Sequence, residues 1–400
     1  MTASADSPTG LGAITPALVA LLAASCGLAV ANLYYAQPLI APISAELGLS
    51  PAAAGLIVTM TQVGYVIGLL FIVPLGDLLE NRRLISFVLG LCAVALLAAT
   101  LSTTALPFLA AMLAVGLCSV VVQILIPLTA HLAPEATRGR VVGTVTSGLM
   151  LGIMLSRPLA SFITHLATWR TVFGLSSGVT LVLALLLGRL LPVRRPPPGL
   201  HYRALLRSML HLALTTKVLR RRAAYQFCSF GAFSQFWTTV PLLLQEPRFG
   251  FTQAGIAWFG LAAVAGAIAA PFAGTLADRG LERFATGLGL CSVAVAFLLT
   301  HVAPASTALH VGILVVAAIL LDFGTSATLV VSQRAVFSLG PAVRARLNGL
   351  FLAIFFIGGA LGSALGAWAY SQGGWAWASW AGILPPLLAF ALFTTELRRR

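Results

Sequence analysis

The segment Leu75–Arg83, which reads LGDLLENRR, decides the fold because it recurs half a chain later as Leu276–Arg283, which reads LADRGLER. The aspartates of the two copies are 201 residues apart in a chain of 400. A second pair of segments, Arg138–Gly143 and Arg344–Gly349, is offset by 206 residues. Two matches at nearly one offset indicate a duplicated half. In an apolar chain, duplicated halves are typical of transporters.

The composition places this chain in a membrane. It is 59% hydrophobic and 8% charged, with a mean hydropathy of +0.99. Soluble domains carry about 25% charged residues, so these charges are too few to build a water-soluble surface. The cysteines lie singly in apolar runs, as small core residues do, and neither a disulfide framework nor a metal site is expected.

Long apolar runs define the predicted helices. A spanning helix needs about 20 mostly apolar residues. The first half offers six segments, at 14–36, 52–74, 84–102, 105–130, 141–163 and 169–190. The second half offers six more, at 223–245, 252–273, 284–303, 307–331, 347–370 and 375–395. These runs show no period-two alternation, so the prediction is an all-α membrane protein of twelve transmembrane helices in two six-helix domains, 1–190 and 223–400.

The segment between the halves, 191–222, has a different character. Three successive prolines at 196–198 interrupt any helix, and arginines are frequent on both sides of them. This pattern favours a solvated basic linker. The alternative is a basic amphipathic helix that lies on a membrane surface.

The positions of the basic residues predict the orientation. With the twelve-helix count, 21 of the 24 Lys and Arg residues fall on one side of the membrane. Arg170 and Arg248 fall on the other side, and Arg157 lies within the membrane. Positive residues mark cytoplasmic loops, so both termini are expected in the cytoplasm. The net charge of +14 then faces anionic lipid, which removes the case for a nucleic-acid partner.

The repeated loop joins predicted helices 2 and 3, and again helices 8 and 9. It resembles the loop signature G-x-L-A-D-r-x-G-R-R of the major facilitator superfamily, although the first copy departs from it at Val73 and Leu78. The residues that carry the resemblance include Gly76, Asp77, Arg82 and Arg83 in the first copy and Gly274, Asp278, Arg279 and Arg283 in the second. The resemblance implies a monomer with two pseudo-symmetric bundles. We expect these loops to form a conformational gate, because a carboxylate there can pair with neighbouring arginines or cap a helix. The alternative is a purely topological anchor.

Predicted helix 5 carries a series of small residues, which let helix backbones approach closely. Gly148, Gly152, Ser156 and Pro158 resemble the helix-5 glycine–proline signature of proton-driven drug exporters in this superfamily, with Ser156 in place of a glycine and Arg157 before the proline. The runs Asn32–Leu39 and Gln62–Tyr65 resemble a bacterial branch of predicted transporters. The resemblance favours export.

Two charged residues fall inside predicted helices. Burying an ionised group in a bilayer costs about 3 kcal/mol or more, so such residues usually have a function. We predict that Asp322 is the proton-coupling carboxylate, with a contact to a cationic solute or a structural hydrogen bond as alternatives. Arg157 is expected either to bind an anionic solute or to be structural. The two residues are predicted to differ in depth by about 10 Å, so no pairing is assumed.

Other polar residues lie on helices that line the central cavity of the resembled fold. With Arg157, the candidates for solute contact are Asn32, Tyr35, Gln37, Gln123, Tyr225, Gln226, Gln235 and Trp237. A wall of aromatic and amide groups suits a planar or amphipathic organic solute. Ordinary helix packing is the alternative for each of them.

These observations together predict a secondary active transporter in the cytoplasmic (inner) membrane. It is expected to move a small organic solute by alternating access, by proton-coupled efflux. No cofactor, metal site or catalytic residue is expected: the phosphate-binding motif GxxxxGK[ST] is absent, and the apolar segments hold no cluster of His, Asp or Glu. The alternatives are a proton-coupled importer of an organic anion and a non-transporting sensor of the same fold.

Overall fold

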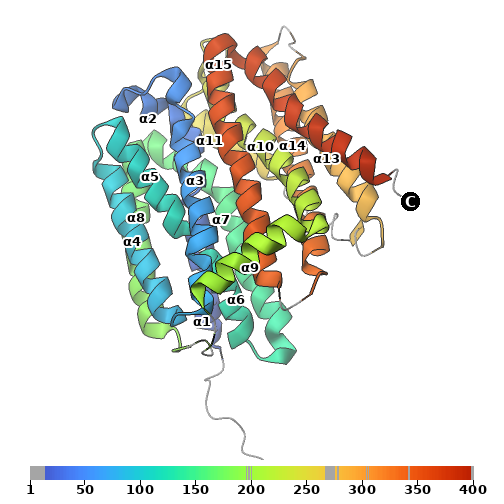
Figure 1. The fold of residues 1–400 in the computed structure, drawn as a ribbon. Helices are drawn as coiled ribbons and strands as arrows, with labels where there is room; N and C mark the ends of the chain where they lie inside the picture. Colours follow the sequence, from blue (N-terminus) through green and yellow to red (C-terminus); the bar gives the residue numbers. More distant parts are fainter. Residues whose placement is uncertain are drawn as a thin grey trace, which may run out of the picture.

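The computed structural model is a bundle of long helices that run mostly alongside one another (Figure 1). It describes residues 14–194, 196, 199, 201–265, 275–276, 279–302, 304, 306–340 and 343–397. The elements of these ranges are helical, and they fit the two six-helix halves predicted from the apolar runs.

Among its described residues, the first half contains five helical segments long enough to cross a membrane, preceded by a shorter apolar helix, and several of these segments are broken by short turns. The first expected span is interrupted: its helix ends at Ala31, and the chain continues through a turn. The elements are α1 (Pro16–Ala31), η1 (Gln37–Leu39), α2 (Ile40–Leu47), η2 (Pro51–Ala53), α3 (Leu56–Phe71), η3 (Val73–Asp77), α4 (Asn81–Leu101), α5 (Ala105–Ser119), α6 (Val122–Leu132), η4 (Glu135–Thr137), α7 (Arg138–Leu166) and α8 (Trp169–Leu190).

The second half repeats this plan. Its elements are α10 (Lys217–Gln245), α11 (Gln253–Ala263), α13 (Glu282–Leu299), α14 (Thr307–Phe337) and α15 (Arg344–Leu397). α15 comprises the last two predicted spans, which meet at a sharp bend. Gly374 has φ 62° and ψ −153° there, a conformation that other residues rarely adopt. Part of the expected span 252–273 lies outside the described residues.

The duplication is visible in how the helices pack. Gly152 of α7 lies so close to Gly27 of α1 that an added Cβ would overlap the Gly27 carbonyl oxygen. In the second half, Gly362 of α15 has the same relationship to Gly231 of α10. Predicted helices 5 and 11 therefore hold equivalent positions against helices 1 and 7, through the close backbone approach that small residues permit.

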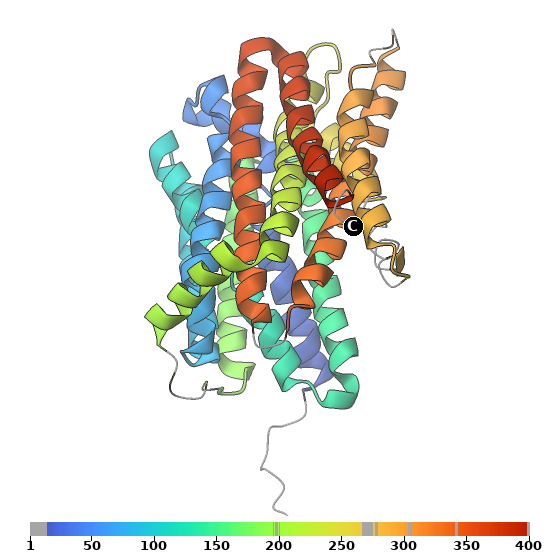
Figure 2. The same cartoon turned by 45° about the vertical axis from the view of Figure 1, so that its right-hand side comes forward.

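The connection between the halves differs from the favoured solvated linker. It contains a helix, α9 (Tyr202–Thr215), and α10 begins at Lys217 rather than near residue 223. Leu205 and Met209, four positions apart and therefore on one face of α9, are buried. The Tyr202 hydroxyl donates a hydrogen bond to the Phe71 carbonyl at 2.9 Å. Burial of this apolar face is the physical reason that the segment packs across one side of the bundle, near the end at which α15 begins (Figure 2).

The two halves meet along paired helices, principally α3 with α15 and α7 with α11. The Thr59 hydroxyl donates to the Ala360 carbonyl at 3.1 Å. The Gln62 amide donates to the Ser234 hydroxyl at 2.9 Å. These buried polar contacts cross the interface, so a change in the relative position of the halves must break them.

Candidate functional site

A cluster of buried polar and aromatic side chains lies where the halves meet, and Arg157 of α7 is at its centre. The Arg157 side chain is 6% exposed. Its Nε donates a hydrogen bond to Gln37 Oε1 at 2.6 Å. Its guanidinium carbon lies 4.5 Å from the ring centroid of Trp237, 5.0 Å from that of Phe233 and 5.1 Å from that of Tyr34. Aromatic faces stabilise a cation that has left water.

Asp322 of α14 joins the same cluster through Trp237. The indole N–H donates to Asp322 Oδ1 at 3.0 Å. Arg157 and Asp322 lie near enough for their charges to attract, although no direct ion pair joins them in the described structure. The Asp322 side chain keeps partial exposure. Trp237 therefore contacts both charged groups, with its ring face toward one and its N–H toward the other.

Two donors of this cluster have no protein partner within the described residues. Arg157 Nη2 and Gln37 Nε2 are both buried without a hydrogen bond. A buried donor without a partner costs about 1–3 kcal/mol. Folded proteins pair the large majority of their buried polar groups, so these two donors call for an acceptor that the described residues do not supply.

Gln123 lies in a separate cluster near the α9 end of the bundle. Its amide donates to the Tyr65 hydroxyl at 3.2 Å, and its Oε1 accepts from Asn348 of the second half at 3.4 Å. Gln123 lines a cavity of about 60 Å³ together with Asp77 and Arg346. It is thus a cross-half contact, but it does not join the Arg157 cluster.

The remaining cavity candidates bond mostly within their own half. Asn32 accepts from Ser176 at 2.6 Å, Tyr225 donates to Glu396 at 2.8 Å, and Gln226 accepts from Thr328 at 3.0 Å. The Gln235 amide donates to the Ala378 carbonyl, and Tyr35 is buried beside Ser176. These contacts join helices within one half, so of the amide and aromatic candidates only Gln37 and Trp237 share the cluster of Arg157 and Asp322.

The first copy of the repeated loop is ordered by its own polar groups. The Asn81 side chain donates to the Gly76 carbonyl at 2.7 Å. Glu80 pairs with Arg83 at 3.2 Å and with Arg82 at 3.8 Å. The carboxylate of Asp77 lies near enough to the guanidinium groups of Arg194 and Arg346 to be attracted by their positive charges. Because Arg346 lies in the first turn of α15, the attraction between Asp77 and Arg346 acts across the two halves.

The second copy of the loop is only partly described. Gly274 and Asp278 lie outside the described residues. Arg279 and Arg283 are exposed.

The small-residue series of α7 lies partly at the contact between the halves. The Ser156 hydroxyl donates to the Ile153 carbonyl at 2.8 Å, and Pro158 lies beside Gly260 of α11.

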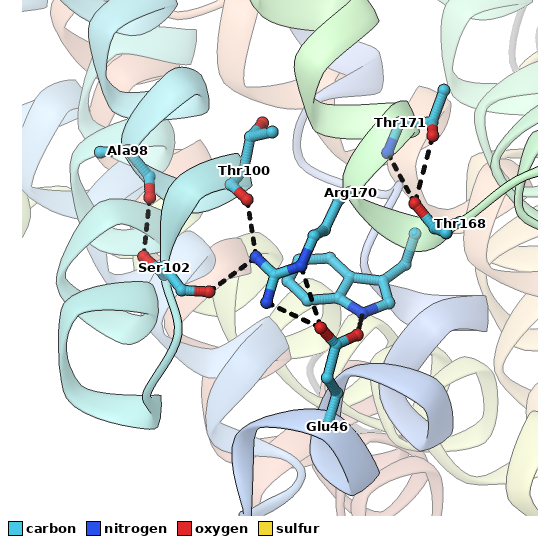
Figure 3. Close-up of polar contacts among 8 residues, drawn as sticks. Glu46, Ala98, Thr100, Ser102, Thr168, Arg170 and Thr171 are labelled. Carbon is cyan, nitrogen blue, oxygen red and sulfur yellow. Dashed lines mark hydrogen bonds and ion pairs between the residues drawn. The ribbon is translucent and has the colours of Figure 1, made fainter.

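A further polar cluster lies at the opposite end of the bundle from α9, and the sequence pattern did not single it out. Figure 3 shows Arg170 of α8 between Glu46 and the end of α4. Arg170 donates to Glu46 Oε1 at 2.8 and 3.0 Å and to the Thr100 and Ser102 carbonyls at 2.6 and 2.7 Å. The hydrogen bonds from Arg170, and then the one from Trp169, hold the pKa of Glu46 below its usual value. This cluster ties α2, α4 and α8 together.

Two six-helix halves with a charged cluster at their interface define a membrane transporter. The family model of the Major Facilitator Superfamily matches residues 19–315 and 250–400, and the chain belongs to that superfamily. It is 41% identical over 370 residues to "Uncharacterized transporter YgaY" of Escherichia coli O157:H7, which covers 92% of this chain and 93% of the relative. It is 32% identical to "Probable transporter SCO4007" of Streptomyces coelicolor, with 91% and 84% covered.

A solved structure supports the same fold. The chain is similar, with a TM-score of 0.78, to a bacterial homologue of the human lysosomal transporter Spinster in an inward-facing and unoccupied conformation. The likeness covers 97% of this chain and 98% of that protein at 15% sequence identity. At this identity the likeness concerns the fold alone.

Proposed function

We propose that this transporter couples the movement of a small organic solute to protons, with Asp322 as the group that carries the proton. The observation that carries the proposal is the position of Asp322 in the cluster around Arg157, where the two halves meet. It is a carboxylate on a membrane helix, bonded through one indole N–H and attracted by Arg157 of the other half. Carboxylates at membrane depth commonly serve proton relays.

The geometry suggests how a proton changes the conformational equilibrium. When Asp322 is ionised, its charge attracts Arg157 and holds α14 toward α7. When it is neutral, that attraction is lost. A proton on Asp322 therefore weakens a contact that must break when the halves separate, and partial exposure of the side chain gives the proton access. Alternating access needs such a differential contact between states.

The proposed direction is efflux by antiport. It rests on the small-residue series of α7, which resembles that of proton-driven exporters and packs α7 closely against α1. In this scheme, solute and proton compete for the site around Asp322, so each leaves when the other binds.

A second candidate is proton-coupled import of an organic anion. Arg157 Nη2 and Gln37 Nε2 are buried donors without partners, and a carboxylate of a solute would accept from both. Protonation of Asp322 would release Arg157 for the anion. Proton and anion would then bind together, which is symport.

The test is proton flux into or out of proteoliposomes that hold the purified protein, challenged with cationic, neutral and anionic aromatic solutes. Asp322→Asn is compared with Glu135→Gln, a carboxylate outside the cluster. Solute-driven flux that is lost only in Asp322→Asn supports the proposal, and the active solute together with the sign of the flux separates antiport from symport. Flux that survives in Asp322→Asn rejects Asp322 as the proton carrier.

A further inference from the structure

A second cavity lies away from the Arg157 cluster, between the α9-side ends of four helices in the second half. It has a volume of about 1110 Å³. Its wall comes from the start of α10, the start of α13 and the ends of α14 and α15. The charged residues that the described part of the chain contributes to this wall are Lys217, Arg220, Arg221, Arg222, Arg334, Glu282 and Glu396.

The two carboxylates of this wall are already engaged. Glu396 accepts from Arg222 at 3.4 Å and from the Tyr225 hydroxyl at 2.8 Å. Glu282 lies 3.8 Å from Arg334. Both acidic groups thus neutralise cations that belong to the same cavity, so they are not free to balance the other basic residues.

Three cations of the wall remain without a carboxylate partner in the described part of the chain. Arg221 donates to the neutral hydroxyl of Thr395 at 2.6 Å. Lys217 and Arg220 are exposed and make no ion pair with a described residue. Among the described residues of the wall, five basic side chains against two acidic ones give this hollow a surplus of positive charge, and its concave shape focuses that charge.

The wall also has an apolar part. Val218 and Leu339 line the cavity, and each is 39% exposed. The cavity lies at the end of the bundle that the distribution of Lys and Arg predicts to be cytoplasmic, where anionic lipid headgroups gather. A concave basic site with an apolar margin at that depth matches a phosphate group that carries acyl chains better than it matches a free ion.

We propose that this cavity binds the phosphate group of an anionic phospholipid, with Lys217, Arg220 and Arg221 as its principal contacts. Basic hollows between transmembrane helices on the cytoplasmic side recognise such headgroups, because several cations share one phosphate. Occupation of the hollow would join α10 to the end of α14, two elements of the half that carries Asp322.

The test is native mass spectrometry of the purified full-length protein after incubation with phosphatidylglycerol or with phosphatidylcholine. Wild type is compared with Arg220→Gln/Arg221→Gln and with the control Arg203→Gln/Arg207→Gln, a basic pair on α9 that does not line the cavity. Wild type and control are expected to retain phosphatidylglycerol in preference to phosphatidylcholine. The amount of phosphatidylglycerol that the cavity variant retains is expected to be lower by roughly tenfold or more. Lys217→Gln, an exposed single change, provides a second variant if the double variant does not fold.

A separate titration with inorganic phosphate distinguishes the two sources of phosphate. If inorganic phosphate displaces the lipid at millimolar concentration, the lipid assignment is wrong and the hollow is a site for a soluble anion. Equal losses in the cavity and control pairs overturn the proposal, because binding then follows general surface charge. Equal retention of phosphatidylcholine overturns it as well, since the headgroup charge would not matter.

Discussion

Arg157 and Asp322 come from opposite halves of the transporter and meet on one indole without forming an ion pair. The guanidinium of Arg157 lies 4.5 Å from the ring centroid of Trp237, and the indole N–H donates to Asp322 at 3.0 Å. A direct buried ion pair would be costly to separate, because each charge would be left buried without its partner. An intervening ring leaves an attraction that a proton or a solute charge can outweigh, which is the property that a coupled carrier requires.

Trp237→Phe is expected to separate coupling from solute binding. Phenylalanine keeps an aromatic face for Arg157 but removes the donor to Asp322, a hydrogen bond to a charged group worth about 1.5–3 kcal/mol. Solute affinity is expected to change little, while the ratio of protons to solute moved falls. Both are measurable in the same proteoliposomes. An unchanged ratio would show that the indole N–H has no part in coupling.

Arg157→Met combined with Gln37→Leu is expected to abolish transport without loss of thermal stability. The pair of changes removes the buried charge, its hydrogen bond and both donors that lack partners. Replacing two buried polar partners by apolar groups of similar shape is often neutral or stabilising. Arg157→Met alone leaves the Gln37 oxygen unpaired and is expected to be less stable than the double variant. A double variant that unfolds well below the wild type would assign Arg157 a structural role.

Asp77→Asn is expected to slow transport at unchanged expression. The substitution removes the attraction between Asp77 and Arg346, which acts across the halves at the α9 end. Glu80→Gln is the matched control, because Glu80 pairs with Arg82 and Arg83 of its own loop. Initial rates of solute flux, normalised to the amount of reconstituted protein, provide the measurement. Transport that survives in Asp77→Asn would exclude the gate role and leave a topological anchor.

The Glu46 cluster predicts a pH dependence of stability. The pKa of Glu46 is lower in the folded protein than its usual value, mainly because of the hydrogen bonds from Arg170. Its contribution to stability is therefore fully present above about pH 4.3, the ordinary pKa of glutamate, and is lost as the pH falls through the lower folded-state pKa. The carboxylate is 49% exposed, so water screens the interaction and the effect is small.

Thermal unfolding between pH 6 and the acid limit of the protein measures this contribution, as the difference between wild type and Glu46→Gln. The difference is expected to shrink as the solution becomes more acidic. Glu135→Gln, which alters a carboxylate without an ion pair in the described structure, is expected to show no such trend. A constant difference across this pH range would contradict the assignment to Glu46.

The sequence predicted the fold well because its signals are long-range and redundant. Apolar runs, the repeated loop and the bias of basic residues each indicate the two-half architecture on their own. Asp322 and Arg157 stood out as charges in apolar helices, but a depth estimate along the helix axis suggested separate sites. That estimate omits the length of the Arg157 side chain and the breadth of the Trp237 indole. The long side chain reaches the indole, and the indole reaches Asp322, so the two charged residues belong to one cluster.

The other cavity candidates show what the sequence left open. An amphipathic helix shows its orientation through polar spacing, but α1 is apolar over most of its surface and α10 carries polar residues on all sides, so neither has a single polar face. The sequence therefore did not show which way the side chains of Asn32 and Gln226 point. In the structure, both bond to partners within their own half. The helix α9 was underestimated because its basic residues outweigh an apolar face that becomes stable only when the bundle buries Leu205 and Met209.

Gly152→Ala tests whether the close approach of α7 to α1 matters for both stability and transport. The new methyl group would overlap the Gly27 carbonyl, so the helices must separate. Overpacking of this kind costs about 1–3 kcal/mol.

Gly143→Ala is the matched control on the same helix, because a Cβ there meets no atom within 4 Å. In that variant the higher helix propensity of alanine is expected to leave stability unchanged or raised by up to about 1 kcal/mol. Thermal unfolding and solute flux measured on both variants separate the two effects. If Gly152→Ala is as stable and as active as Gly143→Ala, the packing of α7 against α1 tolerates a wider spacing, and the small-residue series has another purpose.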